Sequence, residues 1–284
     1  MPDKDQRAKQ AAKHIALMRN VFSAEIAASA AGAQIYEDGD GRELPIPEPR
    51  FEATTTSVTT DFAPKALYAT KGSAVIIDAG AFTRPGGNYE GGSFGPEQVL
   101  CSESDLYPIL CELKDAYYEK NRGWESGLLF NDRALYLHDV AFTRNGALRK
   151  ADVVVIAAPN RTRALENNRS PEGCDQALSF RIEAMLRVAA SGGASTLICG
   201  AFGCGPQGND DAQVAGLVKA WLDAHPGVFE HVVFAVPRGS FEAFDAVFGA
   251  PAAAEPAPAP DAQEDTDEDE SWRDIELPEG VTLG

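Results

Sequence analysis

The chain has 284 residues, of which 44% are hydrophobic and 24% charged. It is therefore long enough for a packed core, and its composition excludes collagenous, coiled-coil and wholly disordered classes. Its 43 acidic residues outnumber the 25 basic ones and give a formal net charge of −18. Because duplex nucleic acid binds to a basic face, this charge excludes direct duplex binding.

The sequence contains no apolar run long enough to cross a membrane, and residues 1–7 lack the pattern of a secretory signal. We therefore expect a cytoplasmic protein with no membrane partner. The five cysteines form no CxxC pair, and the four histidines show no zinc spacing. We accordingly expect no disulfide, no metal site and no cofactor.

Residues 4–34 carry apolar side chains at helical spacing, with alanine at many of the other positions. This periodicity predicts a helix or a pair of helices ahead of the main body. We expect residues 1–50 to form a helical extension that packs on the domain that follows.

From Phe51 onward, short β-branched runs alternate with longer helical stretches, which is the pattern of βα units in a mostly parallel sheet. Residues 153–156 are apolar at every position, as in a strand covered on both faces. The sequence predicts an α/β sandwich over residues 51–249, with ligands bound beyond the carboxyl ends of its strands. The predicted strands are Thr54–Thr59, Ser73–Asp78, Ala134–His138, Val153–Ala158, Thr196–Gly200 and Val232–Val236, and the predicted helices are Ala63–Thr70, Gln98–Asn121, Pro171–Ala190, Asp210–Asp223 and Ser240–Phe248.

Residues 250–284 alternate proline with alanine and then become acidic, with eleven acids against one arginine. A segment of this composition cannot bury enough apolar surface to fold. We expect a disordered acidic tail.

The first candidate ligand loop follows Asp78 and ends near Gln98. It contains five glycines within residues 86–95. Glycines let a backbone lie close against a ligand, although a flexible surface connection is the alternative.

The second candidate loop spans residues 200–210 and reads Gly-Ala-Phe-Gly-Cys-Gly-Pro-Gln-Gly-Asn-Asp. A strand end that leads into a helix N-terminus offers unpaired N–H groups to an anion, as phosphate-binding loops do. The loop matches neither the dinucleotide fingerprint nor the Walker motif, so a structural turn is the alternative. Two such loops in one sheet favour a nucleotide-sized ligand.

The two loops resemble those of the microbial-type poly(ADP-ribose) glycohydrolases. In that family the first loop reads PGGG, about seven residues and QEE, followed by LCxxSxLY; here PGGN (85–88) precedes PEQ (96–98) and a matching segment at 100–107. The family's second loop, GAxGCGVFxND, is similar to residues 200–210. The resemblance runs from about Phe51 to Phe248. It implies a macrodomain-like, three-layer α/β/α sandwich that binds ADP-ribose and, in active members, hydrolyses its glycosidic bond.

The resemblance also implies which residues contact the ligand, which would be ADP-ribose or an ADP-ribosylated macromolecule. Asn160 follows a predicted strand in an Ala-Pro-Asn segment similar to the family's, and is one candidate. The other candidates lie in the two loops: Gly86, Gly87, Asn88, Gly200, Ala201, Phe202, Gly203, Cys204, Gly205 and Gln207.

Three positions depart from the family pattern. Gln98 stands where the family has its second, catalytic glutamate, Asn88 replaces the third glycine, and Gln207 replaces the aromatic residue that orients the distal ribose. A glutamine can hydrogen-bond a ribose, but it neither protonates a leaving oxygen nor activates water. Glu97 is one position earlier, and about 100° of helical rotation is expected to aim its carboxylate elsewhere unless the loop register shifts.

Asp78 ends a predicted buried strand where the family usually has asparagine. It is either a ligand-facing carboxylate or a strand-end acid paired with Arg84. The candidate catalytic residues are therefore Asp78, Glu97 and Gln98. Three functions remain open: an ADP-ribosyl glycohydrolase with an altered acid/base group, an ADP-ribose reader without catalysis, and another nucleotide-metabolite enzyme on the same fold.

Overall fold

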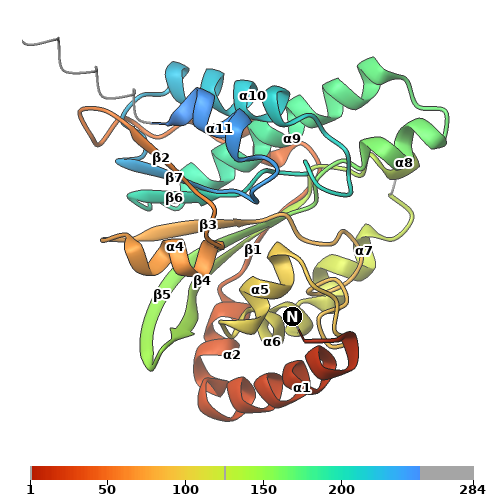
Figure 1. Ribbon diagram of the computed structural model, residues 1–284, viewed down its shortest axis with the longest axis vertical. Helices are drawn as coiled ribbons and strands as arrows, with labels where there is room; N and C mark the ends of the chain where they lie inside the picture. The colour runs from red at the N-terminus through yellow and green to blue at the C-terminus, as the bar shows by residue number, and fades with distance from the viewer. Residues whose placement is uncertain (1, 125, 250–284) are drawn as a thin grey trace, which may run out of the picture. The chain divides into compact units, whose positions relative to one another are not determined.

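A seven-stranded mixed sheet lies at the centre of the molecule, in the order β1-β4-β5-β3-β6-β7-β2 (Figure 1). The computed structural model describes residues 2–124 and 126–249. The five strands from β5 to β2 in this order pair in parallel, whereas β4 is antiparallel to β5 and β1 is antiparallel to β4. The strands are β1 (Gln34–Tyr36), β2 (Thr55–Thr59), β3 (Ala74–Asp78), β4 (Ala134–Arg144), β5 (Ala147–Ile156), β6 (Thr196–Cys199) and β7 (His231–Ala235).

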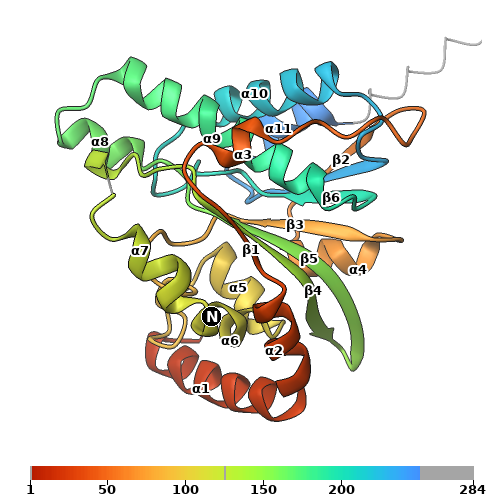
Figure 2. The ribbon, with the colours of Figure 1, turned by 180° about the vertical axis from the view of Figure 1, so that it is seen from behind.

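Helices cover both faces of the sheet, as Figures 1 and 2 show. Along β3, Val75 and Ile77 point into the core beneath α9 and α10, whereas Ile76 points into the core beneath α5 and α6. This arrangement confirms the predicted three-layer α/β/α sandwich. The helices are α1 (Lys4–Val21), α2 (Ser23–Ala31), α3 (Asp40–Glu43), α4 (Ala63–Ala69), α5 (Pro96–Ser102), α6 (Leu106–Glu112), α7 (Glu119–Asn121), α8 (Arg161–Glu166), α9 (Pro171–Ser191), α10 (Asp211–Ala224) and α11 (Phe241–Phe248), with a π-helical turn at Lys114–Tyr118 and a 3₁₀ turn at Ser126–Leu128.

Most predicted elements lie within one residue of their observed bounds, but the two strands β4 and β5 are longer than predicted. They form an antiparallel hairpin whose two-residue turn is Asn145-Gly146, both with positive φ. Such Asn-Gly turns match the twist of paired strands and are a hairpin signal that the prediction overlooked. The register of β4 shifts between Leu137 and Val140, around Asp139 at φ 56°.

The single helix predicted over Gln98–Asn121 is wrong. The segment is divided into α5, α6, a π-helical turn and α7. The Ser104 hydroxyl donates to Leu100 O at 2.6 Å and accepts from Leu106 N at 3.2 Å. A serine that bonds the local backbone in this way competes with the helical ladder, and here it turns the chain between α5 and α6.

The N-terminal region forms the predicted helices α1 and α2, and it also contributes β1 to the edge of the sheet. The division of the chain at residue 50 stays a prediction. The predicted tail, residues 250–284, lies outside the described residues. In the part of the chain that the structure describes, no helix is both long and apolar enough to span a bilayer.

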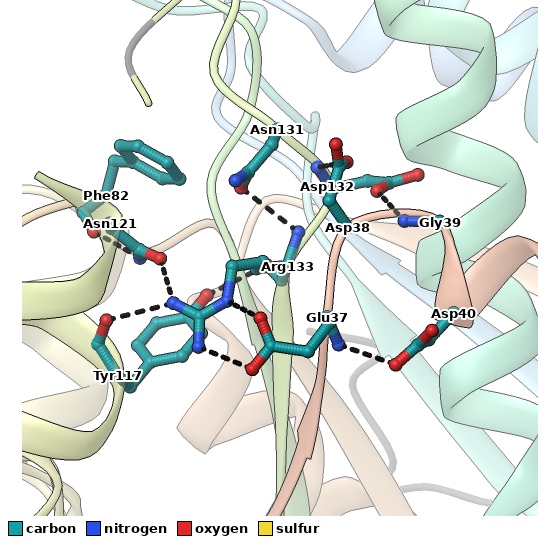
Figure 3. A network of polar contacts seen from close by, with 10 residues as sticks. All are labelled: Glu37, Asp38, Gly39, Asp40, Phe82, Tyr117, Asn121, Asn131, Asp132 and Arg133. Carbon is teal, nitrogen blue, oxygen red and sulfur yellow. Dashed lines mark hydrogen bonds and ion pairs between the residues drawn. The ribbon is translucent and has the colours of Figure 1, made fainter. Parts of the chain in front are cut away.

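A buried arginine connects the N-terminal region to the first candidate loop (Figure 3). Arg133, which is 3% exposed, donates from Nε to Glu37 Oε2 at 2.7 Å and from Nη1 to Asn121 Oδ1. Asn121 in turn donates from Nδ2 to Phe82 O at 2.6 Å. The start of the loop is therefore held by a fully buried amide whose orientation depends on Arg133.

Candidate functional site

The carboxyl ends of four parallel strands, β2, β3, β6 and β7, surround a cavity of about 110 Å³. This is the position that the parallel sheet predicts for a ligand. The lining consists of Thr60, Asp61, Phe62 and Ala63 after β2, Ile77, Asp78 and Ala79 at the end of β3, Pro96 and Leu100 of α5, Gly200, Ala201 and Phe202 after β6, and Ala235, Val236 and Pro237 at the end of β7.

The structure brings Asp78 together with the start of the second loop, because both line this cavity. Of the second-loop candidates, Gly200 and Ala201 are partly exposed, whereas Phe202 is buried in the core. The first-loop glycines and residues 203–207 lie outside the cavity lining.

Gly86 and Gly87 have positive φ values of 59° and 61°. A Cβ at Gly86 would lie 2.6 Å from the Tyr107 ring, and one at Gly87 would lie 2.8 Å from Gln98 Nε2 and 2.9 Å from Glu97 Oε2. Only glycine fits at these two positions. The first loop therefore packs its backbone directly against the side chains at the start of α5.

Glu97 and Gln98 converge in the first turn of α5, so the expectation that Glu97 points elsewhere is wrong. Gln98 Nε2 donates to Glu97 Oε2 at 3.3 Å and to Gly86 O at 3.1 Å, while Glu97 Oε1 accepts from Ala81 N at 3.2 Å. Contacts to the loop backbone draw both side chains to the same side of the helix end, despite the rotation between their Cα positions. The Gln98 amide thereby helps to hold Glu97 in place.

Asp78 is the last residue of β3 and is 1% exposed. Neither of its carboxylate oxygens has a hydrogen-bond partner among the described residues, and the predicted alternative partner Arg84 pairs with Glu90 instead, at 3.7 Å. A Cβ built on Gly80 would lie 3.4 Å from both Asp78 Oδ2 and Glu97 Oε1. The two carboxyls are therefore neighbours across Gly80.

Burial raises the pKa of Asp78 to about 7. Burial also raises the pKa of Glu97 well above its ordinary value, and the nearby Asp78 carboxyl raises it further. Two close carboxyls that are removed from water do not ionise together, so the pair retains at least one proton near neutral pH. Such a pair can both give and take a proton, which is what acid/base chemistry requires.

The second loop is held by Asn209, whose role is not apparent from the sequence. Asn209, which is 3% exposed, donates from Nδ2 to Pro159 O at 2.9 Å and to Gly203 O at 3.0 Å. Gly203 has φ 71°, and a Cβ there would lie 2.8 Å from that of Ala158. Gly205, by contrast, is exposed and has open space around it.

The remaining candidates of the second loop have local contacts. Cys204 is half-buried and its thiol lies 3.8 Å from Phe202 O. Gln207 O accepts from Thr162 N at 3.0 Å, which ties the loop to α8. Asn160 is the N-cap of α8, where its Oδ1 accepts from Arg163 N at 3.0 Å. Asn88 lies in the first loop, where its backbone O accepts from Ser93 N at 3.1 Å.

Two exposed aromatic residues beside the cavity were also missed. Phe62 lines the cavity and meets Phe94 of the first loop edge to face, with ring centroids 6.0 Å apart. They are 45% and 47% exposed. Isolated phenylalanines in loops carry no periodic signal, so only the folded arrangement reveals the pair.

Solved structures of poly(ADP-ribose) glycohydrolases have the same fold. The enzyme from Thermomonospora curvata matches with a TM-score of 0.76 and 25% identity over 86% of this chain and 100% of that chain. Its complex with the inhibitor ADP-HPD matches with a TM-score of 0.73 and 26% identity over 85% and 99%. The enzyme from Deinococcus radiodurans in complex with ADP-ribose matches with a TM-score of 0.69 and 29% identity over 78% and 96%.

The fold thus defines an α/β sandwich of the poly(ADP-ribose) glycohydrolase type. Over residues 8–145 the chain matches the family model described as microbial-type PARG, catalytic domain. The family resemblance that the two loops predict is therefore confirmed, and the match begins within α1. No curated protein matches the sequence.

Within residues 2–124 and 126–249, no group of three or more histidine, cysteine, aspartate or glutamate side chains could hold a metal ion.

The raised pKa of Asp78 predicts a pH dependence of stability. Folded Asp78 retains its proton up to about pH 7, whereas an unfolded aspartate releases it near pH 4. The folded state therefore binds the extra proton, and the free energy of unfolding should fall by up to about 1.4 kcal/mol per pH unit across this window. Because asparagine cannot ionise, Asp78→Asn should gain stability relative to wild type as the pH rises from about 4 to about 7.

Urea denaturation at a series of pH values measures this difference. Asp223→Asn, which alters an exposed carboxyl on α10, is the matched control and should follow the wild-type curve. A wild-type-like pH dependence in Asp78→Asn would show that Asp78 ionises normally in the folded protein.

Proposed function

We propose that this protein binds ADP-ribose, free or attached to a macromolecule, and hydrolyses the ADP-ribosyl glycosidic bond with Asp78 and Glu97 as its acid/base pair. The observation that carries the proposal is the buried, unpartnered carboxyl of Asp78, which lines the cavity and lies across Gly80 from the Glu97 carboxyl. A buried acid without a partner is costly, so its presence at the carboxyl ends of the strands calls for a functional explanation.

Binding is supported by the shape and the backbone of the site. The cavity extends to the start of the second loop, and this loop is rich in glycine, as backbone sites for a diphosphate are. The aromatic pair Phe62 and Phe94 offers apolar surface beside the cavity for a base. The similar Deinococcus enzyme is in complex with ADP-ribose, which supports the same class of ligand here.

Hydrolysis needs one group that protonates the leaving oxygen and one that accepts a proton from water. In the proposed reaction, the protonated carboxyl of the pair donates to the leaving oxygen as the bond from the ribose C1 breaks. The other, ionised carboxyl takes a proton from the water that forms the new C1–O bond. The products are ADP-ribose and the protonated acceptor group.

Gln98 has a positioning role in this proposal. Its amide donates to both Glu97 and Gly86 O, which a carboxylate could not do without a proton. We propose that it fixes Glu97 against the first loop and takes no part in proton transfer.

The second candidate function is an ADP-ribose reader that does not hydrolyse its ligand. It is favoured by Gln98 at the position of the family's catalytic glutamate, together with the departures at Asn88 and Gln207. Another nucleotide-metabolite enzyme on this fold is the remaining alternative.

We further propose a cytoplasmic location and no duplex nucleic acid partner. All five cysteines are free in the structure, which is the usual state in a reducing compartment. The excess of acidic residues opposes binding to a duplex backbone.

Gly205→Leu tests the binding site. Gly205 has open space around it, so a leucine should fold normally yet obstruct the diphosphate. Loss of one or two charge-assisted contacts should weaken ADP-ribose binding by about 1–3 kcal/mol in calorimetry. Gly216→Leu, at an open and exposed glycine of α10, is the control and should bind as wild type. Unchanged affinity in folded Gly205→Leu would remove this loop from the site.

Asp78→Asn and Glu97→Gln test the chemistry. Each should slow the release of ADP-ribose from an ADP-ribosylated substrate by 10²–10⁴-fold, which is the usual contribution of one acid/base group. Binding of ADP-ribose should remain, and the surface variant Asp223→Asn should react like wild type. Single-turnover release, measured alongside calorimetry, separates these effects.

Gln98→Glu separates the two leading functions. If the pair is the acid/base group, a third carboxyl 3.3 Å from Glu97 brings no gain in rate. Binding without hydrolysis in wild type, together with a rise in hydrolysis for Gln98→Glu, would instead identify a reader. Failure to bind ADP-ribose at all would favour another nucleotide metabolite.

A further inference from the structure

The N-terminal helix α1 lies directly against the first candidate loop, although the two are far apart in the sequence. Arg7 Nε donates to Gly92 O at 2.8 Å, across 85 residues of chain. The same guanidinium donates from Nη1 to Pro2 O at 2.6 Å. One partly buried cation therefore joins the beginning of the chain to the loop.

Gly92 lets the helix and the loop touch through their backbones. Its φ is 76°, and a Cβ there would lie 2.9 Å from Ala8 N and closer still to Lys4 O. Any other residue would push the first turn of α1 away from the loop. The close approach is therefore specified by the sequence.

A second contact between α1 and the loop lies further along the helix, at His14. The Tyr89 hydroxyl is 3.2 Å from His14 Nδ1, and the Tyr89 ring packs on Tyr107 with centroids 5.2 Å apart. Tyr107 is also the side chain that a Cβ at Gly86 would strike. These contacts form a continuous path from α1 to the glycine that meets Gln98.

Between α1 and α5 there is a cavity of about 300 Å³, with Arg7, His14, Tyr89, Phe94 and Gln98 in its lining. Side chains do not fill the space between helix and loop at this point. The loop is consequently held on this side by a few discrete contacts and not by a continuous packed interface. Removing one such contact should therefore reduce the order of the loop more than that of the core.

We propose that α1 positions the first loop for the ligand, with Arg7 and Gly92 as the positioning residues. Neither residue lines the ligand cavity; they act through the loop backbone that meets Glu97 and Gln98. A loop that is already ordered does not have to be ordered by the ligand, so α1 should raise affinity by removing that entropic cost. Only the identity of the ligand in this inference rests on the proposed function.

The test compares Arg7→Ala with Lys9→Ala in the full-length protein. Lys9 is an exposed lysine of the same helix that forms no ion pair among the described residues, so it matches the change in charge. Hydrogen exchange of the backbone amides at residues 87–92 reports the order of the loop, and calorimetry reports the affinity for ADP-ribose. Arg7→Ala should speed exchange and weaken affinity by about tenfold each. Lys9→Ala should change neither, and Arg7→Lys should restore part of both.

Gly92→Ala provides an independent test, because the added Cβ would push α1 away from the loop by a change in the loop itself. Its effects should match those of Arg7→Ala, and the double variant should be no worse than either single one, since both break one contact. Wild-type exchange at residues 87–92 in Arg7→Ala overturns the proposal, as does faster exchange throughout the sheet in both variants. Faster loop exchange in a protein that binds no ADP-ribose supports the role of α1 and contradicts the proposed function.

Discussion

Burying the carboxyls of Asp78 and Glu97 beside each other opposes folding, because neither can ionise freely away from water. Asp78 has no partner among the described residues, and Glu97 has the Ala81 amide and the Gln98 side chain. The sheet determines the position of Asp78, because this residue ends β3, the central strand, which has parallel neighbours on both sides. The backbone of the first loop then packs against Glu97 and Gln98, and the cavity leaves Asp78 facing the space at the carboxyl ends of the strands.

Two arginines from different parts of the chain hold the first loop. Arg133 fixes its start through Asn121 and Phe82, and Arg7 holds its later part through Gly92. The two bonds that reach the loop, from Asn121 and from Arg7, both end on backbone carbonyls, which fixes the path of the loop without using its side chains. The loop can therefore present glycines to a ligand and still be ordered. Through these bonds the N-terminal region supports the first loop of the candidate site.

The sequence predicts the layers well, because apolar runs such as 153–156 and the alternation of β-branched runs with helical stretches are local signals. That Asp78, Glu97 and the two glycine loops form the ligand site stays a prediction, and the cavity lining includes Asp78 and only the start of the second loop. The turn at Ser104, between α5 and α6, is not predicted. A serine that bonds the backbone looks the same in sequence as one that faces solvent. Asn209, Arg7 and Phe62 were missed because their roles depend on partners distant in the chain. The convergence of Glu97 and Gln98 depends on loop contacts, which helical periodicity alone does not contain.

A crystal structure of the wild-type protein with ADP-ribose tests the central claim most directly, because it locates the ribose C1 among the three candidate side chains. We expect a carboxyl oxygen of Asp78 or Glu97 within about 3.5 Å of C1 or of a water beside it, which is the separation of reacting groups. Gln98 should still donate to Gly86 O. A complex in which Gln98 alone reaches C1, and neither the Asp78 nor the Glu97 carboxyl contacts the ligand, would contradict the claim that these two carboxyls perform the chemistry.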